Sequence, residues 1–201
     1  MKKTFLAIIT LIVVGSTNAQ IKDKGTVEIT PKIGSSTYFE SNENYDTDYN
    51  AGIEIGATVD YYFNDRWSLR SGLITNKMGG IYRDFSTRVE NKLYYLNIPI
   101  NANWHFGSTR KWNLNFGLTT SFLTKGLYIE NGQTYQLHNN DIQSAQLGFT
   151  YGIGYKIEIN KKFGILLDAQ FFDGLTNINK SAENRITNHG FSFNLGGVIQ
   201  L

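Results

Sequence analysis

The sequence contains no cysteine, only two prolines and no apolar run long enough for a membrane helix. Without cysteine the chain has no disulfide framework, no thiol chemistry and no lipid anchor on an N-terminal cysteine. A membrane helix needs about 20 predominantly apolar residues in succession. If the chain crosses a membrane, it must therefore do so with strands, which are held by hydrogen bonds and burial alone.

The N-terminal residues have the order of a secretory signal peptide. Lys2 and Lys3 form a positive start, residues 5–14 form a short apolar core, and residues 15–19 are small or polar. The alternative to a signal peptide is a membrane anchor, but the apolar core is too short for one. We predict that residues 1–19 are a signal peptide and that cleavage after Ala19 leaves Gln20 first.

The remaining chain also lacks a surplus of charge. Without Lys2 and Lys3, the 19 basic residues fall to 17, against 17 acidic residues. A net charge near zero gives no electrostatic reason to expect nucleic acid as a partner.

What the chain does have is aromatic residues, glycine and a period-two pattern. It contains 13 Phe, 12 Tyr, 3 Trp and 20 Gly, a mixture that favours strands and turns. Between residues 53 and 63, apolar or aromatic side chains alternate with Glu54, Gly56, Thr58, Asp60 and Tyr62. Similar alternation predicts eight strands, near residues 26–39, 50–63, 67–80, 93–106, 112–126, 143–159, 163–173 and 189–201.

The predicted connections alternate between short and long. Short turns fall at 64–66, 107–111 and 160–162, and long polar loops at 40–49, 81–92, 127–142 and 174–188. Outer-membrane barrels have tight periplasmic turns and longer external loops. We therefore predict that residues 20–201 form an all-β domain, an eight-stranded antiparallel up-and-down transmembrane β-barrel in the bacterial outer membrane.

Alternation alone also fits a soluble barrel whose apolar row points into a ligand cavity. Three features favour outer-membrane lipid as the partner of that row: strand length, the polar opposite row, and aromatic residues at strand ends. Trp67, Trp104 and Trp112 all lie beside short turns. The expected girdle at the other end contains Phe39, Tyr82, Phe85, Tyr128 and Phe171. Pro31 and Pro99 fall inside predicted strands, where we expect a bulge or irregular pairing.

Several segments resemble the PorT-like family of small outer-membrane β-barrels of Bacteroidota. They are residues 95–100 (YLNIPI), 115–118 (NFGL), 152–155 (GIGY) and 172–178 (FDGLTNI). The resemblance covers the whole predicted mature chain and implies the barrel fold and its location, without a shared catalytic motif. The founding member of the family is associated with protein secretion and gliding. We therefore expect a non-enzymatic scaffold, surface-binding or secretion-accessory protein with possible cell-envelope protein partners.

The inward rows carry nearly balanced charges. The acids are Glu28, Glu54, Asp60, Glu158 and Asp168, and the bases are Lys32, Arg66, Arg70 and Lys156, together with His105. Buried charges need partners, and eight strands leave an interior just wide enough for side chains. We expect a paired network that fills the lumen; the functional alternative is a proton or ion path.

The alternative function is a lipid-modifying hydrolase with a Ser/His/acid site at the outer rim. Its candidates are His138, His189, Ser181 and Glu183; His105 is predicted at the periplasmic end. The acidic loop with Glu40, Glu43, Asp46 and Asp48 offers oxygen ligands for calcium, but its spacing fits no known loop template, and we favour a solvated acidic loop. We assign no catalytic, cofactor or metal residues.

Overall fold

The computed structural model describes residues 22–42, 47–83, 87–137, 141–180 and 184–201. The predicted signal peptide therefore lies outside the described residues. So do His138, Ser181 and Glu183 of the predicted hydrolase site, Glu43 and Asp46 of the acidic loop, and Phe85 of the expected girdle. No helix in the described part of the chain is long and apolar enough to span a bilayer.

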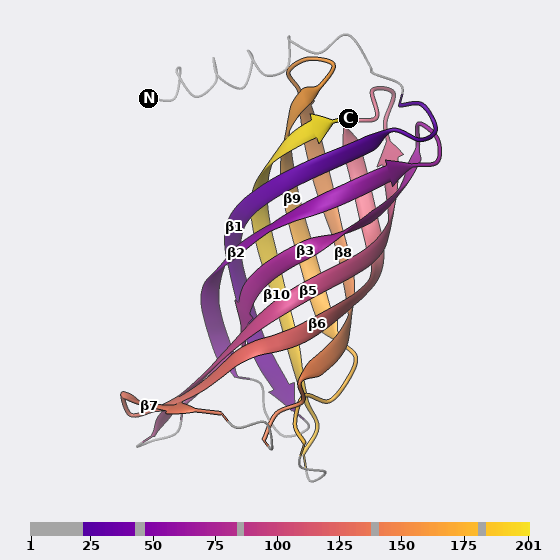
Figure 1. Cartoon of the computed structure of the whole chain (residues 1–201). Coiled ribbons are helices and arrows are strands. Elements are labelled where there is room, and N and C mark those ends of the chain that lie inside the picture. Colours follow the sequence, from indigo (N-terminus) through magenta and orange to yellow (C-terminus); the bar gives the residue numbers. More distant parts are fainter. Residues whose placement is uncertain (1–21, 43–46, 84–86, 138–140, 181–183) are drawn as a thin grey trace, which may run out of the picture.

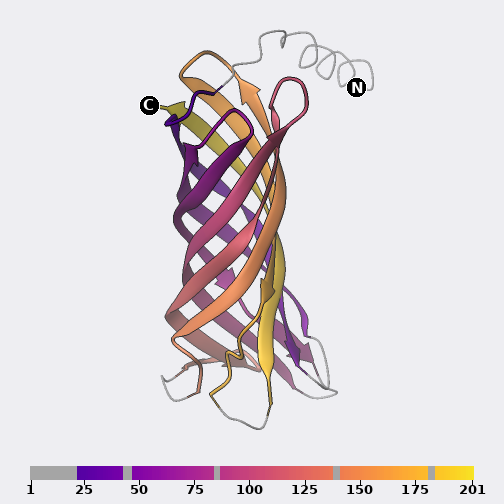
Figure 2. The same ribbon diagram turned by 90° about the vertical axis from the view of Figure 1, so that its right-hand side faces the viewer.

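The predicted eight-stranded antiparallel barrel is confirmed (Figures 1 and 2). Its wall strands are β1 (Val27–Asn42), β2 (Asp48–Tyr62), β3 (Trp67–Met78), β5 (Arg88–Phe106), β6 (Trp112–Glu130), β8 (Ala145–Glu158), β9 (Phe163–Gly174) and β10 (Ile186–Gln200). Two short strands lie at the far ends of the wall strands: β4 (Gly80–Arg83) pairs with β2 and β5, and β7 (Gln133–Gln136) pairs with the end of β6. Antiparallel pairing of β1 with β10 closes the barrel and leaves its wall without an edge.

The barrel has a turn end and a loop end. The turn end contains the short connections β2–β3, β5–β6 and β8–β9, and both Val27 and Gln200 lie there (Figure 1). Two of these turns are closed by an asparagine side chain. Asn64 and Asn160 each accept two hydrogen bonds from backbone N–H groups, at 2.8–3.0 Å. Asparagine forms such turns readily because its side chain can replace a backbone acceptor. The predicted short turns are thus confirmed.

The two faces of the wall have the predicted polarity. On β2, Ile53 is 65% exposed and Ile55 52%, whereas Glu54 is 4% and Asp60 2% exposed. The other strands repeat this pattern, with Phe193 and Leu195 outside and Ser192 and Asn194 inside. The apolar row therefore points outward and the polar row fills the interior, which is opposite to a soluble ligand-binding barrel.

The prolines interrupt the ladder without a bulge. Pro31 pairs with Ala57 on β2, but the ladder to β10 skips from Ile29 to Lys32 and keeps its register. Pro99 pairs with Thr119, and the ladder to β3 makes a similar skip. Each proline lacks the N–H that would bond on the skipped side. The expected irregular pairing is confirmed, and the register shift lies elsewhere, between Tyr94 and Tyr95 opposite Thr124.

Aromatic rings form a continuous band around part of the turn end. Trp67, Trp104, Phe106, Trp112 and Tyr155 follow one another across four strands with ring centroids 4.7–6.3 Å apart. These rings belong to the outward face beside the short turns. Such a band is typical of the interfacial girdle of a membrane barrel.

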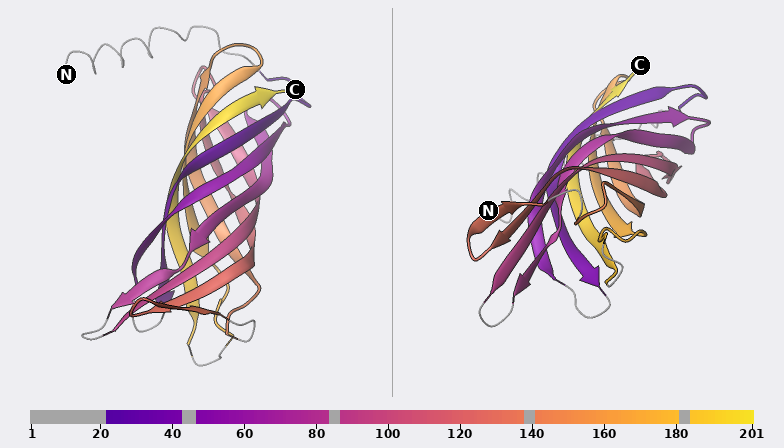
Figure 3. Two further views of the ribbon diagram at one scale, coloured as in Figure 1. Left: turned by 60° about the vertical axis from the view of Figure 1, so that its left-hand side comes forward. Right: turned by 60° about the horizontal axis from the view of Figure 1, so that its bottom comes forward.

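The loop end is more ordered than the sequence predicted. Leu127–Glu130 of β6 pairs with β7 in a hairpin that projects from the barrel (Figure 3). Its turn is Asn131-Gly132, both with positive φ, which is the favoured two-residue hairpin turn. An apolar plug closes this end of the lumen; it consists of Tyr38, Met78, Leu93, Tyr95, Phe172 and Ile178, packed by Leu123, Leu137, Ile142 and Ile186. A Cβ at Gly148 or Gly190 would collide with its rings.

Candidate functional site

The lumen contains two groups of ion pairs, and the first lies near the turn end. Glu28 Oε1 is 2.9 Å from Lys156 Nζ and 3.1 Å from Lys22 Nζ. The Tyr62 hydroxyl donates to Glu28 Oε2 (2.9 Å) and accepts from Lys156 Nζ (3.2 Å). Glu28 thereby joins β1 to β8 across the interior.

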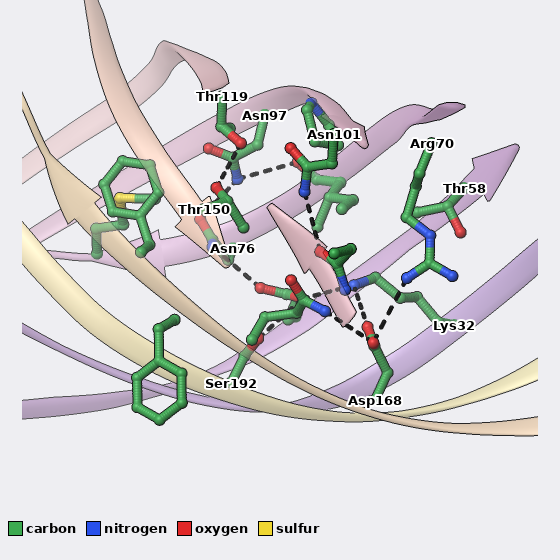
Figure 4. Close-up of a pocket in the computed structure, with 18 of the residues that line it drawn as sticks. Lys32, Thr58, Arg70, Asn76, Asn97, Asn101, Thr119, Thr150, Asp168 and Ser192 are labelled. Atoms are coloured by element: carbon green, nitrogen blue, oxygen red, sulfur yellow. Dashed lines mark hydrogen bonds and ion pairs between the residues drawn. The ribbon is translucent and has the colours of Figure 1, made fainter. Parts of the chain in front are cut away.

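The second group forms a chain of alternating charge across the middle of the lumen, and Figure 4 shows its central members Lys32, Arg70 and Asp168. Asp168 lies between two cations, 3.5 Å from Lys32 Nζ and 3.6 Å from Arg70 Nη1. Lys32 continues to Glu54 (3.1 Å) and Arg70 to Asp60 (3.0 Å). All five side chains are only 3–7% exposed. Charges buried this deeply are stable because each has a partner of opposite sign.

Neutral donors satisfy the remaining carboxylate oxygens. Glu54 accepts from Asn194 (2.8 Å), Ser192 (3.2 Å) and Asn76 (3.2 Å), and Asp60 accepts from Asn103 (2.8 Å). Asparagine carries both donors and an acceptor. The many inward asparagines of the sequence thus act as hydrogen-bond links between charged groups and neighbouring strands.

The predicted inward charges are largely brought together. Glu158 and Arg66 are the exceptions, because at the turn end Glu158 is only half-buried and Arg66 is exposed. Lys22 was missed, since it precedes the strands whose alternation gave the prediction. His105 stacks on Tyr62 at 4.8 Å, and its Nε2 lies 3.0 Å from Ser68 Oγ. Because Ser68 rather than the histidine contacts Asp60, these residues lack the order of a catalytic triad.

The side chains leave little free space in the lumen. The cavity beside Lys32, Arg70 and Asp168 has a volume of about 40 Å³, which holds only a few water molecules. Beyond it the apolar plug separates the polar network from the loop end. The geometry fits the expected filled lumen better than the alternative of an ion path.

A second constellation lies on the outer face at the loop end. His189 of β10 has its Nδ1 3.0 Å from Asp173 Oδ1 and its Nε2 2.9 Å from Thr187 Oγ1. His189 and Asp173 are directly paired across β10 and β9. His189 was a predicted candidate, but these two partners were not. The signal for Thr187 was the Thr-x-His spacing, which places both side chains on one face of a strand; Asp173 is brought to His189 only by the pairing of β9 with β10.

This constellation borders an open groove of about 420 Å³. Its aromatic lining consists of Phe39, Tyr49, Phe171 and Phe191, and Phe39 stacks on His189 at 5.5 Å. Phe39 and Phe171 were predicted for the girdle at this end. Tyr128, also predicted there, instead lies 6.2 Å from Tyr135 in the projecting hairpin.

The acidic residues of the first loop diverge where they are described. Glu40 is buried and accepts from Asn91 Nδ2 (2.7 Å), whereas Asp48 forms an exposed ion pair with Arg83 (3.1 Å). Within the described ranges, no group of three or more His, Cys, Asp or Glu is placed to hold a metal ion. The calcium alternative therefore gains no support from this part of the chain.

Comparison with protein families covers most of the chain. Residues 18–180 match the family model described as "Outer membrane protein beta-barrel domain". No curated protein sequence matches the chain.

Solved structures of small outer-membrane barrels share the fold. The attachment invasion locus protein Ail of Yersinia pestis, solved with the heparin analogue sucrose octasulfate, has a TM-score of 0.52 at 13% identity, over 88% of this chain and 99% of Ail. Neisserial surface protein A has a TM-score of 0.52 at 14% identity, over 86% and 97%. The N-terminal β-barrel domain of Pseudomonas aeruginosa OprF has a TM-score of 0.50 at 14% identity, over 90% and 100%.

Proposed function

The chain belongs to the outer membrane protein β-barrel domain family, and from this premise we propose that it is a non-enzymatic surface-binding or scaffold protein that acts through its loop end. One observation carries the proposal. The interior is closed by paired charges and an apolar plug, whereas the opposite, loop end carries an ordered projecting hairpin. A barrel of the bacterial outer membrane whose described residues leave no open passage is suited to work through its outside surface.

The hairpin has the chemistry of a binding surface. Tyr135 is 53% exposed, and β7 also carries Gln133, Thr134 and Gln136, all exposed. Tyrosine offers a large rigid contact area at small entropic cost, and small polar side chains add hydrogen bonds that adapt to a partner. We therefore propose that the hairpin contacts the ligand or envelope protein.

We further propose that the protein is PorT-like and that its partner belongs to the cell envelope. The matching segments 95–100 and 152–155 lie in wall strands β5 and β8, and they define the scaffold rather than the contact surface. The partner is expected at the loop end, outside the membrane. This role includes the secretion-accessory function that the resemblance implies.

Cysteine labelling tests the proposal, because the sequence has no native cysteine. Gln133→Cys places a thiol on the hairpin and Lys161→Cys on a turn. On intact cells, a membrane-impermeant maleimide should label position 133, and position 161 only after lysis. A photo-crosslinker at position 133 should give an adduct that Tyr135→Ser abolishes. Labelling of position 161 alone would reverse the orientation, and an absent adduct at position 133, or one that survives Tyr135→Ser, would contradict binding through the hairpin.

A second candidate function is hydrolysis of a lipid ester, favoured by the Thr187–His189–Asp173 geometry. His189 Nε2 would take the proton of Thr187 as its Oγ attacks the ester carbonyl carbon, with Asp173 holding the Nδ1–H. The alcohol would leave with that proton, and water would then release the acid from threonine. We rank it second because Thr187 is only 8% exposed. Labelling by an alkyl fluorophosphonate that requires both Thr187 and His189 would favour it over the first proposal.

A further inference from the structure

Four basic side chains gather on the outer wall at the loop end, and we call them the basic wall. They are Lys77 of β3, Arg88 and Lys92 of β5, and Lys125 of β6. Tyr94 is the direct cross-strand partner of both Lys77 and Lys125. Lys92 is two residues from Tyr94 on the same strand, so the pleat places it on the same face.

The basic wall begins one membrane thickness away from the tryptophans. Lys77 follows Trp67 by ten residues on β3, and Tyr94 precedes Trp104 by ten residues on β5. A tilted strand covers roughly 25 Å in that length, which is the height of the apolar band of a membrane barrel. The outward positions between these ends carry no charge; they are Leu69, Ser71, Leu73 and Thr75 on β3, and Leu96, Ile98, Ile100 and Ala102 on β5. The lysines therefore lie at the headgroup level.

A β-bulge places Lys125 on this wall. Strict alternation from the outward Trp112 would aim residue 125 into the lumen. The register shift opposite Tyr94 and Tyr95 adds one residue to β6, so that Lys125 pairs with the outward Tyr94. Thr124 fixes the bulge, because its hydroxyl donates to the Tyr94 carbonyl (3.0 Å). Bulges commonly re-aim a side chain at a functional position.

The positive charges of the basic wall are only partly compensated. Glu90 is 3.3 Å from Lys92 Nζ and 3.7 Å from Arg88 Nη2, and Lys77 Nζ donates to the amide oxygen of Asn50 (2.7 Å). Four cations around one carboxylate leave three positive charges in excess within this set. The opposite wall, on β9 and β10, instead presents Asp173 beside His189 at the loop end. The excess of positive charge is therefore local.

We propose that the basic wall binds the phosphate group of an outer-leaflet lipid. The proposal rests on the orientation in the proposed function, with the loop end outside. A phosphate accepts several hydrogen bonds from ammonium and guanidinium groups, and the apolar rows below the lysines would contact the acyl chains of the same molecule. This combination selects a lipid headgroup rather than a free anion, because only a lipid occupies both levels of the wall.

Native mass spectrometry of the refolded, detergent-solubilised barrel with purified diphosphoryl lipid A tests this. Each basic residue near a charged lipid surface changes binding by about fivefold. Lys92→Gln and Lys125→Gln should each weaken lipid A binding about fivefold, and the double variant about 25-fold. Glu90→Gln should strengthen binding, a result that a purely structural role for Glu90 would not give.

Control variants and competitors distinguish lipid binding at the basic wall from changes in overall charge, in folding or in binding of free phosphate. Lys161→Gln and Lys162→Gln, at the turn end, should leave binding unchanged, and urea unfolding should show that all variants are folded. Millimolar inorganic phosphate should not displace the lipid. Equal retention of dephosphorylated lipid A, displacement by inorganic phosphate, or full binding by the double variant would overturn the proposal. Since no protein partner is present, these outcomes are independent of the hairpin crosslinking result.

Discussion

The ion-pair network of the lumen and the basic wall each contain four lysine or arginine side chains, but these differ in their partners. In the lumen, Lys22, Lys32, Arg70 and Lys156 each have a carboxylate oxygen within 2.9–3.1 Å. On the basic wall, Glu90 contacts two of the four cations, Lys92 at 3.3 Å and Arg88 at 3.7 Å. The lumen is neutral within its own network, and the basic wall is not.

The difference follows from what surrounds each set. Lumen side chains are nearly inaccessible to solvent, so any unpaired charge there would be strongly destabilising. Side chains of the basic wall are more accessible, with Lys92 27% and Arg88 58% exposed, and water or headgroups can stabilise them. Charged side chains of the lumen must therefore pair with one another, whereas the basic wall can keep surplus positive charge for a binding partner.

Breaking the lumen network should have the largest effect. Asp168→Leu leaves Lys32 and Arg70 with one carboxylate each and the buried network with a net positive charge. We expect a loss of about 3–5 kcal/mol in the free energy of unfolding, measured by urea denaturation in phospholipid vesicles.

Asp48→Leu is the matched control, because Asp48 pairs with Arg83 where both side chains are at least 60% exposed. It should cost about 0–1 kcal/mol. A similar cost for the two substitutions would mean that the lumen is hydrated rather than closed.

A charge on the apolar wall should have the next largest effect. Ile153 lies on the outward face of β8, four residues nearer to mid-membrane than Ile157. Ile153→Arg should destabilise the barrel by about 2–4 kcal/mol and Ile157→Arg by about 0–1 kcal/mol, because the cost depends on depth. Unfolding in vesicles measures both. If Ile157→Arg cost as much as Ile153→Arg, the turn end would not lie at an interface.

The smallest expected signal is electrical. The wild-type barrel in a planar bilayer should carry no appreciable ion current, because the residual cavity is about 40 Å³ and the apolar plug follows it. Recordings at neutral pH check this. Stable, reproducible openings would contradict the filled lumen and would revive the ion-path alternative.

The sequence was sufficient to predict most of the wall. Period-two alternation located all eight strands, because each has one apolar and one polar face, and the tryptophans beside the turns predicted the interfacial band. Asn131-Gly132 is also a hairpin signal, but it fell within a segment assigned to a loop. The strands consequently continue farther at the loop end than predicted, with β5 starting at Arg88 and β6 ending at Glu130.

The contacts within the lumen and at the loop end could not be predicted. Glu28 and Lys156 are 128 positions apart, and only closure of the barrel and the stagger of its strands bring them together. The plug residue Ile178 and its neighbour Ile142 lie between strands, where no periodicity indicates a buried face. Likewise, Lys125 faces outward because of one extra residue at Thr124, which alternation cannot reveal.

The apolar plug also affects the thermodynamics of any encounter at the loop end. Ile178, Leu137 and Ile142 belong to connecting segments, and their side chains pack at the mouth of the barrel. Residues held in this way have already lost conformational entropy during folding, so a partner need not order them again on binding. Substitutions that loosen the plug should therefore weaken binding mainly through entropy, even when they lie below the contact surface.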